Sequence, residues 1–392
     1  MIAGSSIPTR RLEELCEINI GKTPSRAKAE YWNGSYPWLS IADMNQGRSL
    51  QKTKEGITEA GIKASGIKLV AKGTLVLSYK LSIGKVGITE RDMFTNEAIA
   101  ALPIKDSSLL DLNYLYWALS TIDLLGSSDR AAMGKTLNKS KLKEIRVPLP
   151  PLEEQKRIAK ILDASDALRT KRRESLAQLE SLLQSTFLDM FGDPASCESH
   201  WDRCVLGDVV EFAKDGPHVS PEYSEEGIPF LSARHVRPGK IIWEDLKHVS
   251  QEEAQRQWKK CRPQEGDILY TKGGTTGIAA TVATPEPFAI WVHVALLRPL
   301  TNLVHPMWLE AMLNTKYCYQ QSQKYTHGIA NRDLGLKRMV KIDMYLPPLE
   351  MQARFVRVAK LILRERQRYL DHLGELDSLF LSLQSRAFVG EV

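Results

Sequence analysis

An internal repeat constrains this sequence more than any other feature. The segment LPPLEEQ at residues 149–155 returns as LPPLEMQ at residues 346–352, an offset of 197. Three further pairs of similar segments precede these two motifs and occur in the same order in each half. With offsets of 192 to 194, they are 12–17 with 206–211, 36–44 with 228–236, and 73–78 with 266–271. Solenoid repeats are only ~20–50 residues long. The longer period therefore predicts two tandem units, each a domain followed by a helical segment.

Each unit is expected to begin with a globular domain of mixed secondary structure. Residues 1–148 contain short apolar runs separated by glycine and proline, which is typical of strands joined by turns. An apolar helical segment follows at residues 112–125, and residues 195–345 repeat the same plan. We therefore expect an α+β protein with an internal pseudo-two-fold repeat. Its two globular domains, 1–148 and 195–345, are each followed by a long-helix segment, at 149–194 and 346–392.

The proline pairs mark the starts of the two long helices. A proline in the first helical turn costs no hydrogen bond, and the carboxylates of Glu153 and Glu350 suit the positive end of the helix dipole. No glycine or proline interrupts residues 152–191, so one helix of about 40 residues, ~60 Å long, is predicted. Apolar residues recur every three or four positions in both helices. The expected packing residues are Ile158, Leu162, Leu176, Leu179, Leu183, Phe355, Ile362, Tyr369, Leu373, Leu376 and Phe380.

Neither long helix can bury an apolar seam by itself. The simplest partner for each helix is the other, which predicts an antiparallel coiled coil with one globular domain at each end. The first helix is more polar in the middle of its seam than at its ends. The alternative is two separate coiled coils, each of which dimerises with a second copy of the chain.

The motifs of catalysis and of cofactor binding are absent from the sequence. Gly21-Lys22-Thr23 resembles the end of a phosphate-binding loop, but Cys16 stands where the first glycine of that loop would be. Neither Gly-x-Gly-x-x-Gly nor Gly-x-Ser-x-Gly occurs, and the eight histidines and five cysteines form no metal-ligand pattern. We therefore expect no metal, no cofactor and no catalytic activity in this chain.

Composition narrows the class of protein further. The sequence contains no run of ~18 apolar residues, so we expect no membrane span. Five cysteines without a Cys-x-x-Cys pair indicate a reduced, cytoplasmic protein. The net charge is +6, and residues 1–148, with 21 basic and 15 acidic residues, carry all of that excess. The first domain therefore suits a polyanionic partner.

Polar loops that contain glycine lie beside the predicted strands of both domains. They span 21–32, 78–87 and 133–141 in the first domain, and 213–223, 271–280 and 326–335 in the second. Their lysines, hydroxyl groups and backbone amides suit phosphate contacts, while arginine, asparagine and histidine can read base edges. The recurrence of all three loops indicates a shared binding role.

Through these motifs the sequence resembles, over essentially its whole length, the specificity subunits of Type I restriction–modification systems. The segment GKTPSRAKAEYWNGSYPWLSIADMN at 21–45 is similar to the opening of a target-recognition domain. Residues 145–179 and 342–360, which contain the two LPPLE motifs, resemble the central conserved region and its C-terminal copy. The second domain departs from the pattern, since Asp215-Gly216-Pro217-His218 stands where the first has Gly-x-Thr-Pro-Ser.

The resemblance implies DNA recognition without catalysis. Each domain would read one half of a bipartite, asymmetric target in double-stranded DNA, and the helix pair would set the gap between the halves. Two methyltransferase subunits, which bind S-adenosylmethionine, would dock on the helices and on the inner faces of the domains. Two restriction/translocase subunits, which use ATP and Mg, would complete the complex. The implied DNA contacts are Lys22, Thr23, Ser25, Arg26, Lys80, Lys85, Lys135, Asn138, Lys139, Lys214, His218, Arg234, His235, Lys272, Thr275, Thr276, Asn331 and Arg332.

A different class of function also fits the duplicated architecture. A coiled-coil adaptor, whose two similar domains bind proteins rather than DNA, would have the same repeat. The modest net charge favours this alternative slightly. Sequence-selective binding of duplex DNA by the assembled complex would separate the two functions.

Overall fold

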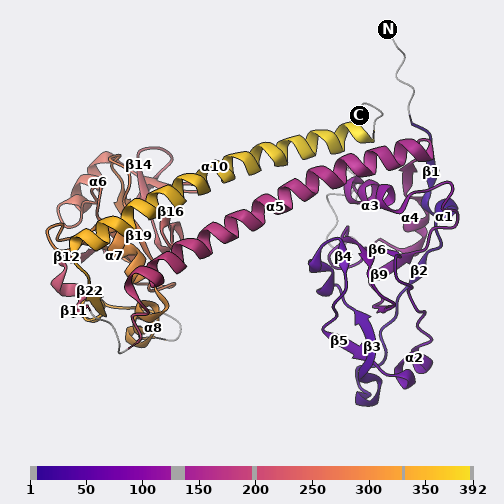
Figure 1. Ribbon diagram of the computed structural model, residues 1–392, viewed down its shortest axis with the longest axis horizontal. Helices are drawn as coiled ribbons and strands as arrows, with labels where there is room; N and C mark the ends of the chain where they lie inside the picture. The colour runs from indigo at the N-terminus through magenta and orange to yellow at the C-terminus, as the bar shows by residue number, and fades with distance from the viewer. Residues whose placement is uncertain (1–6, 125–136, 197–200, 329–331, 389–392) are drawn as a thin grey trace, which may run out of the picture. The chain divides into compact units, whose positions relative to one another are not determined.

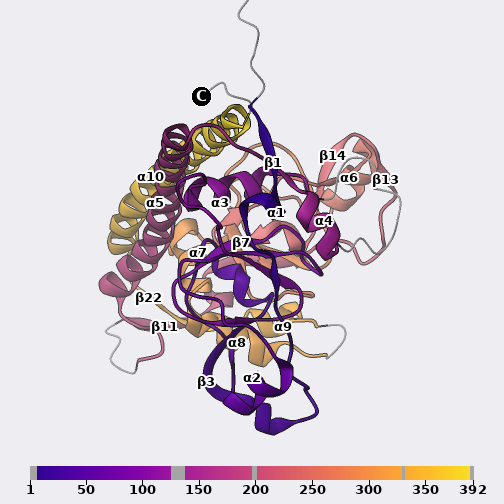
Figure 2. The ribbon, with the colours of Figure 1, turned by 90° about the vertical axis from the view of Figure 1, so that its right-hand side faces the viewer.

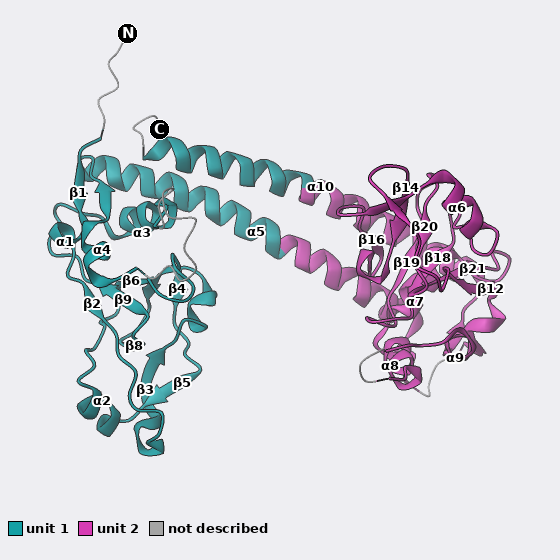
Figure 3. Ribbon diagram, turned by 180° about the vertical axis from the view of Figure 1, so that it is seen from behind, with its two compact units in different colours: residues 1–174, 371–392 teal, residues 175–370 magenta. Residues whose placement is uncertain are grey.

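The computed structural model describes residues 7–124, 137–196, 201–328 and 332–388. It forms two compact units: residues 1–174 and 371–392 make unit 1, and residues 175–370 make unit 2 (Figure 3). Each unit contains one domain of mixed helix and strand together with parts of both long helices. The expected α+β class is therefore confirmed, and the boundary between the units falls within the long helices.

Unit 1 is built on two β-sheets. The larger has the strand order β2 (Asn19–Ile20), β9 (Ile99–Leu102), β6 (Leu75–Ser78), β7 (Val86–Thr89) and β4 (Ser49–Leu50). The smaller has the order β5 (Glu55–Ile57), β3 (Trp32–Leu39) and β8 (Phe94–Thr95), with β3 and β8 parallel. A separate antiparallel pair joins β1 (Thr9–Arg11) to β10 (Arg146–Pro148). The helices of this domain are α1 (Leu12–Leu15), η1 (Ala29–Tyr31), η2 (Asp43–Gln46), α2 (Glu59–Ser65), α3 (Leu112–Thr121) and α4 (Lys139–Glu144).

Unit 2 repeats this topology. Its first sheet has the order β12 (Val210–Asp215), β21 (Val294–Pro299), β18 (Ile268–Thr271) and β19 (Ala279–Thr281). Its second has the order β13 (Tyr223–Ser224), β17 (Lys247–Val249), β14 (Ile228–Leu231) and β20 (Ala289–Ile290), with β14 and β20 parallel. Two further pairs join β15 (Val236–Arg237) to β16 (Lys240–Ile241) and β11 (Asp202–Val205) to β22 (Asp343–Leu346). The helices are η3 (Leu206–Asp208), η4 (Ala233–His235), α6 (Gln251–Trp258), α7 (Pro306–Leu313), α8 (Lys316–Tyr325) and α9 (Leu336–Met339). The order β2-β9-β6-β7 thus has its counterpart in β12-β21-β18-β19.

The two long helices are α5 (Leu152–Phe191) and α10 (Leu349–Ala387) (Figure 1). The prediction of one uninterrupted helix from 152 to 191 is confirmed. In unit 1 the start of α5 packs against the end of α10, because Phe380 shares a buried cluster with Ile158 and Leu162. In unit 2 the end of α5 packs against the start of α10, where the rings of Phe187 and Phe355 are 5.4 Å apart. Within each unit the two helices of one chain therefore pack against each other in antiparallel fashion, as predicted.

The predicted seam lies on the covered sides of the helices. Ile158, Leu162, Phe355, Ile362 and Phe380 are buried, and Leu176, Leu179, Leu183, Tyr369, Leu373 and Leu376 are half-buried. Ionic contacts replace apolar ones in the polar middle of the seam. Arg169 donates from Nε to Asp377 at 2.6 Å, and its guanidinium lies 4.1 Å from the centre of the Phe380 ring.

The larger sheet of unit 1 lies between the long helices and the smaller sheet. In Figure 1, β3, β5 and α2 occupy the end of the unit that is remote from α5. Figures 1 and 2 both show α3 directly beside α5. The core shared with the long helices includes Leu75, Leu77, Tyr114 and Trp117. The apolar residues of β6 and α3 therefore hold the domain against α5.

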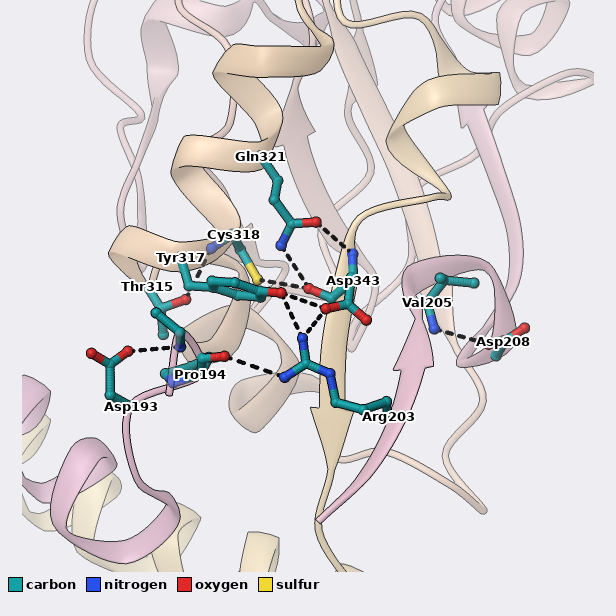
Figure 4. Close-up of polar contacts among 11 residues, drawn as sticks. Asp193, Pro194, Arg203, Val205, Asp208, Thr315, Tyr317, Cys318, Gln321 and Asp343 are labelled. Carbon is teal, nitrogen blue, oxygen red and sulfur yellow. Dashed lines mark hydrogen bonds and ion pairs between the residues drawn. The ribbon is translucent and has the colours of Figure 1, made fainter. Parts of the chain in front are cut away.

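A polar cluster fixes strand β22 just before α10 begins (Figure 4). The carboxylate of Asp343 accepts hydrogen bonds from Arg203 of β11 and from the hydroxyl of Tyr317 in α8. Gln321 bonds the backbone of Asp343 twice, since Nε2 donates to its carbonyl and Oε1 accepts from its N–H, both at 2.8 Å. Burial raises the pKa of the neighbouring Cys318 thiol to about 12. Asp343 thus joins β11, β22 and α8 and ties the entry of α10 to its domain.

Candidate nucleic-acid interface

A short loop connects β6 to β7 in unit 1 and is closed by three hydrogen bonds. The backbone N–H of Ser78 donates to the Lys85 carbonyl at 2.9 Å, and the N–H of Lys85 donates to Ser78 Oγ at 2.9 Å. The N–H of Gly84 donates to the Ser78 carbonyl, also at 2.9 Å. These bonds hold the two ends of the loop together, so residues 79–84 form a tight tip.

Unit 2 has the same frame 193 residues later. The N–H of Thr271 donates to the Ile278 carbonyl, and the N–H of Ile278 donates to Thr271 Oγ1, both at 2.9 Å. The N–H of Gly277 donates to the Thr271 carbonyl at 2.9 Å. Gly84 and Gly277 have φ values of 91° and 88°. A hydroxyl residue at the start and a glycine near the end therefore build both loops alike.

The two tips carry different side chains on this common frame. Unit 1 presents Lys80, Leu81, Ser82 and Ile83, whereas unit 2 presents Gly273, Gly274, Thr275 and Thr276. Lys80 is half-buried and Thr275 is exposed. Thr276 is buried, and its Oγ1 lies 3.0 Å from Oγ1 of Thr326. One tip is therefore apolar and basic, and the other is small and polar.

Close packing of the backbone accounts for Gly21. A Cβ on Gly21 would lie 2.1 Å from the carbonyl oxygen of Thr95. Gly216 is its counterpart in unit 2, where a Cβ would lie 2.0 Å from the carbonyl oxygen of Ile290. Any larger residue would force the backbone apart at both positions. The glycine of the GKT sequence therefore serves the fold and does not cradle a phosphate group.

Lys22 and Thr23 have partners inside unit 1. Lys22 Nζ donates to the carbonyls of Ser65 and Gly66 at 3.0 and 3.2 Å, where α2 ends. A cation there stabilises the negative end of the helix dipole. The hydroxyl of Thr23 donates to the carboxylate of Glu97. Both predicted DNA contacts thus also hold the loop at 21–32 in place.

Arg26 is exposed at the remote end of unit 1. Its guanidinium lies 3.7 Å from the centre of the Trp32 ring and pairs with the carboxylate of Glu55. Stacking on an aromatic face restricts the guanidinium while one side of it stays open to solvent. Ser25, the preceding residue, is exposed as well.

The other described candidates of unit 1 are lysines and one helix cap. Lys85 Nζ donates to Asn45 Oδ1 at 2.6 Å, and Lys80 Nζ lies 5.4 Å from the ring of the preceding tyrosine. The side chain of Asn138 accepts a hydrogen bond of 2.9 Å from the first turn of α4, which it caps. Lys139 follows and is exposed. Asn138 is therefore occupied by its own helix, while Lys139 is accessible.

Lys272 lies inside unit 2 between two acidic residues. Only 5% of the residue is exposed, and its Nζ is 3.3 Å from Asp215 and 3.1 Å from Asp333. Asp215, also buried, has Lys260 at 2.6 Å and the exposed His218 at 3.3 Å. Burial alone would raise the pKa of the Asp215 carboxyl, but Lys260 and Lys272 outweigh it and hold that pKa below its ordinary value. Lys272 thus links the end of β12 at Asp215 to the segment that contains Asp333.

Arg234 and His235 form a local pair. Arg234 is exposed, donates from Nε to His235 Nε2 at 3.0 Å, and donates to the Asp245 carbonyl at 2.8 Å. His235 is buried, and the backbone N–H of Ser232 donates to its Nδ1 at 2.9 Å. Burial and the adjacent Arg234 lower the pKa of His235. A neutral imidazole has one N–H and one acceptor nitrogen, so it can accept from only one of these two donors, and Arg234 is the exposed member of the pair.

The remaining predicted contacts of unit 2 are on its surface or beyond the described ranges. Lys214 is exposed, with Nζ 4.4 Å from the Phe212 ring, and the exposed Arg332 donates to Oε1 of Gln323. Asn331 of unit 2 lies outside the residues that the structure describes, as does Lys135 of unit 1. The surface candidates are thus distributed over both units rather than gathered in one cluster.

Both halves of the chain are similar to a known protein family. The family described as "Type I restriction modification DNA specificity domain" matches residues 6–181 and 198–362, one match in each half of the repeat. The chain belongs to this family of Type I specificity subunits. It is 26% identical over 311 residues to the MjaIX specificity subunit of Methanocaldococcus jannaschii. This match covers 74% of this chain and 71% of that relative. The MjaVIII specificity subunit of the same organism is 23% identical over 384 residues, 93% of the chain and 86% of the relative.

Solved structures agree with this membership at the level of the fold. The S subunit of a Type I restriction–modification system from M. genitalium has a TM-score of 0.58 and 17% identity, and the match covers 99% of this chain and 98% of that one. A chain from a study of complex assembly and conformational transition of the Type I system has a TM-score of 0.59 and 18% identity, with 99% of both chains covered. The match to the family model and the relatives' names, rather than these structures, confirm the predicted family and with it the non-catalytic, DNA-recognising class of protein.

Two properties of the specificity subunit can be stated for its described residues. In these ranges no helix is long and apolar enough to cross a membrane. Within the same ranges, no group of three or more His, Cys, Asp and Glu side chains is placed to hold a metal ion.

Sequence reasoning missed the residues that attach the first domain of the specificity subunit to its long helix. The carboxylate of Asp163, on α5, pairs with Arg48 and accepts a hydrogen bond of 2.7 Å from Trp117 Nε1. The Arg48 guanidinium lies 4.7 Å from the centre of the Tyr116 ring. The repeat gave no signal for this contact, because Lys360 occupies the position of Asp163 in the second LPPLE helix.

Proposed function

We propose that this specificity subunit reads a bipartite, asymmetric target in double-stranded DNA, one half with each unit. The observation that carries the proposal is the shared loop frame at 78–85 and 271–278. A common frame presents the two tips in the same way, while different side chains on the tips prefer different bases. A target with two unlike halves requires two recognition loops, and loops with the same backbone frame but different tip side chains meet that requirement.

The exposed cations of each unit supply the contacts that position the duplex. In unit 1 these are Arg26 and Lys139, to which the half-buried Lys80 and Lys85 beside the tip are added, and in unit 2 they are Lys214, Arg234 and Arg332. Phosphate contacts fix the register of a protein on DNA, and base contacts then give specificity. The buried Lys272, His235 and Thr276 shape the loops of unit 2 rather than touch DNA.

The long helices separate the two readers and carry the partner subunits. Apolar side chains stay exposed outside the seam: Leu168, Leu379 and Leu381 in unit 1, and Leu182, Leu188, Val358 and Leu361 in unit 2. Exposed apolar side chains on a helix favour protein–protein contact. Two methyltransferase subunits with S-adenosylmethionine dock there, and two restriction/translocase subunits with ATP and Mg complete a cytoplasmic complex.

The docking surface is tested best away from the seam. Arg173 pairs with Asp377 at 3.1 Å, so charge reversal at Arg172 and Arg173 would also disturb the helix pair. Leu381→Asp should instead abolish co-purification with the methyltransferase subunit while the fold is kept. Leu69→Asp, at an exposed leucine of the first domain, is the matched control. Equal co-purification of both variants would exclude the proposed surface around Leu381.

Selection from random DNA tests the proposed recognition directly. The subunit in complex with its methyltransferase partner is incubated with a pool of random duplexes, and the bound duplexes are sequenced. The proposal predicts enrichment of two short specified blocks separated by an unspecified gap, and no enrichment by the methyltransferase subunit alone. A complex that enriches no sequence would favour the protein-binding adaptor instead.

A further inference from the structure

Leu81 occupies an unusual position at the tip of the first loop. The residue is 86% exposed, which is the largest exposure among the large apolar side chains recorded for the described residues. Its φ is 63°, in the left-handed region. In the matching frame of unit 2 the same position is Gly274, with a φ of 70°. The two loops therefore share a left-handed turn, but only the first places a leucine in it.

This position is unfavourable to leucine for two separate reasons. A branched side chain in the left-handed region clashes with its own backbone, whereas glycine adopts that conformation freely. The side chain also remains in water, where its apolar surface contributes nothing to the fold. Since Gly274 closes an equivalent loop without either cost, the fold does not require Leu81. Residues held in strained conformations without structural need mark functional sites.

The neighbours of Leu81 define the chemistry that it would meet. The segment 80–85 contains Lys80 and Lys85 and no acidic residue. Ser78 and Lys85 close the loop with backbone and hydroxyl hydrogen bonds, so the tip is held in one shape. An apolar side chain on a fixed tip, with a lysine on each side, matches a groove of DNA, where phosphates flank the bases.

We propose that Leu81 makes an apolar contact with a base in the half-site read by the first domain. This inference rests on the proposed function and names the residue of the first tip that distinguishes bases. An apolar side chain reads DNA in two ways: it packs on the C5-methyl group of thymine, or it inserts between neighbouring bases. Gly274 has no side chain for either contact, so the tip of unit 2 cannot read a base in this way at the equivalent position.

Two substitutions at Leu81 separate the contact from the strain. Leu81→Ala removes the apolar side chain and keeps the Cβ that the left-handed turn disfavours. Leu81→Gly removes both. The matched control is Leu109→Ala, which truncates an exposed leucine of the same unit away from this loop. DNA affinity should follow the side chain, while thermal stability should follow the Cβ.

The experiment uses the complex with the methyltransferase subunit and duplexes that carry the sequence selected by the wild-type complex. Both Leu81 variants should bind roughly 5- to 100-fold more weakly than the wild type, and the control should bind equally well. The Tm of Leu81→Gly should be about 2 °C or more above that of Leu81→Ala. Selection from random duplexes should show that Leu81→Ala loses discrimination at positions of one half-site and keeps the other.

Replacing each thymine of the duplex with uracil then identifies the form of the contact. If Leu81 packs on a methyl group, one uracil should weaken the wild-type complex and leave Leu81→Ala unaffected. If Leu81 inserts between bases, no uracil has this effect, and 2-aminopurine fluorescence at one step should rise with the wild type only. Either result supports the apolar contact.

Three results would overturn the inference. Wild-type affinity and selectivity in both Leu81 variants would remove Leu81 from the DNA interface. Failure of the Leu81 variants to assemble with the methyltransferase subunit, while Leu109→Ala assembles, would make Leu81 a protein contact. A wild-type complex that selects no sequence would refute the proposed function itself, and this inference with it.

Discussion

Gln155 and Gln352 make the same three hydrogen bonds at the starts of the two long helices. In each case Oε1 accepts from the backbone N–H of the residue that caps a domain helix, Asp111 at 2.9 Å and His305 at 2.7 Å. Nε2 of Gln155 donates to the carbonyls of Leu109 and Pro150, at 2.9 and 2.8 Å.

Nε2 of Gln352 bonds the equivalent carbonyls, those of Leu303 at 3.1 Å and Pro347 at 2.8 Å. Both glutamines are fully buried. Each therefore ties a long helix to the cap of the helix that packs beside it, α3 or α7. The final glutamine of the LPPLE-x-Gln motif has this physical role in both halves of the chain.

Removing one of these side chains should destabilise its unit strongly. Gln155→Met keeps the approximate length and volume of the side chain but leaves the N–H of Asp111 and the carbonyls of Leu109 and Pro150 without their partner. Unsatisfied buried groups are costly, so we expect a loss of about 3 kcal/mol in the free energy of unfolding. Chemical denaturation, monitored by tryptophan fluorescence, measures this loss in the free energy of unfolding. The control, Gln178→Met, changes an exposed glutamine of α5, and equal losses in both variants would contradict the account.

Much of the fold could be predicted because the repeat displays it twice. The start of α5, its length and its seam follow from the proline pair, from the absence of helix breakers and from apolar spacing. The repeat also aligned the loops at 78–87 and 271–280, which the structure shows in one frame. Such features depend on local sequence and on periodicity, and both can be recognised in a single amino-acid sequence.

The detail of the candidate site could not be predicted, because it depends on contacts between distant segments. Lys272 is predicted to contact DNA, and its burial depends on Asp215 at the end of β12 and on Asp333, two residues that are distant in sequence and lie beside its Nζ. The pairing of Arg48 with Asp163 joins residues 115 positions apart and has no counterpart in the second half. Leu81 has no motif at all, and only its backbone conformation and exposure single it out.

The salt dependence of DNA binding should depend on Lys85. Lys85→Ala should weaken binding of the complex to its target and reduce the slope of log affinity against log salt concentration by about 1, because one phosphate contact is lost. Titrations between low and moderate salt give the slope. Lys105→Ala, at an exposed lysine of the same unit, should leave affinity and slope unchanged. An unchanged slope in Lys85→Ala would exclude a phosphate contact there.

The stability of unit 2 should depend on the ionisation of Asp215. Its carboxyl is buried, which by itself raises the pKa, but Lys260 and Lys272 lower that pKa below the ordinary value of an aspartate. The stability it contributes is therefore fully present above that ordinary value, ~3.9, and is lost as the pH falls through the lowered pKa. Asp215→Asn should be less stable than the wild type at pH 7, and this difference should shrink as the pH falls below about 4.

Unfolding curves at several pH values check the role of Asp215. The exposed Asp202 gives a matched control, and Asp202→Asn should differ little from the wild type at any of these pH values. A difference between the wild type and Asp215→Asn that stays constant from pH 7 to acid would show that the Asp215 charge makes no contribution.

The length of the helix pair should set the gap between the two half-sites. Inserting seven residues between 174 and 175, and seven more between 370 and 371, keeps the heptad seam in register in both helices. A heptad adds about 10 Å of helix, which corresponds to about three base pairs of DNA. The selected target should keep both specified halves and widen its gap by about that amount. An insertion in one helix alone should instead break the seam, and an unchanged gap in the doubly lengthened subunit would refute the spacer role.

The most direct test of the central claim is to sequence N6-methyladenine in DNA from cells that express this subunit with its neighbouring methyltransferase subunit. The account predicts methylation in a split motif of two short specified halves with an unspecified gap, and loss of that methylation when the specificity subunit is deleted. Methylation that is absent, or that persists without the subunit, would contradict its role as the reader of the target.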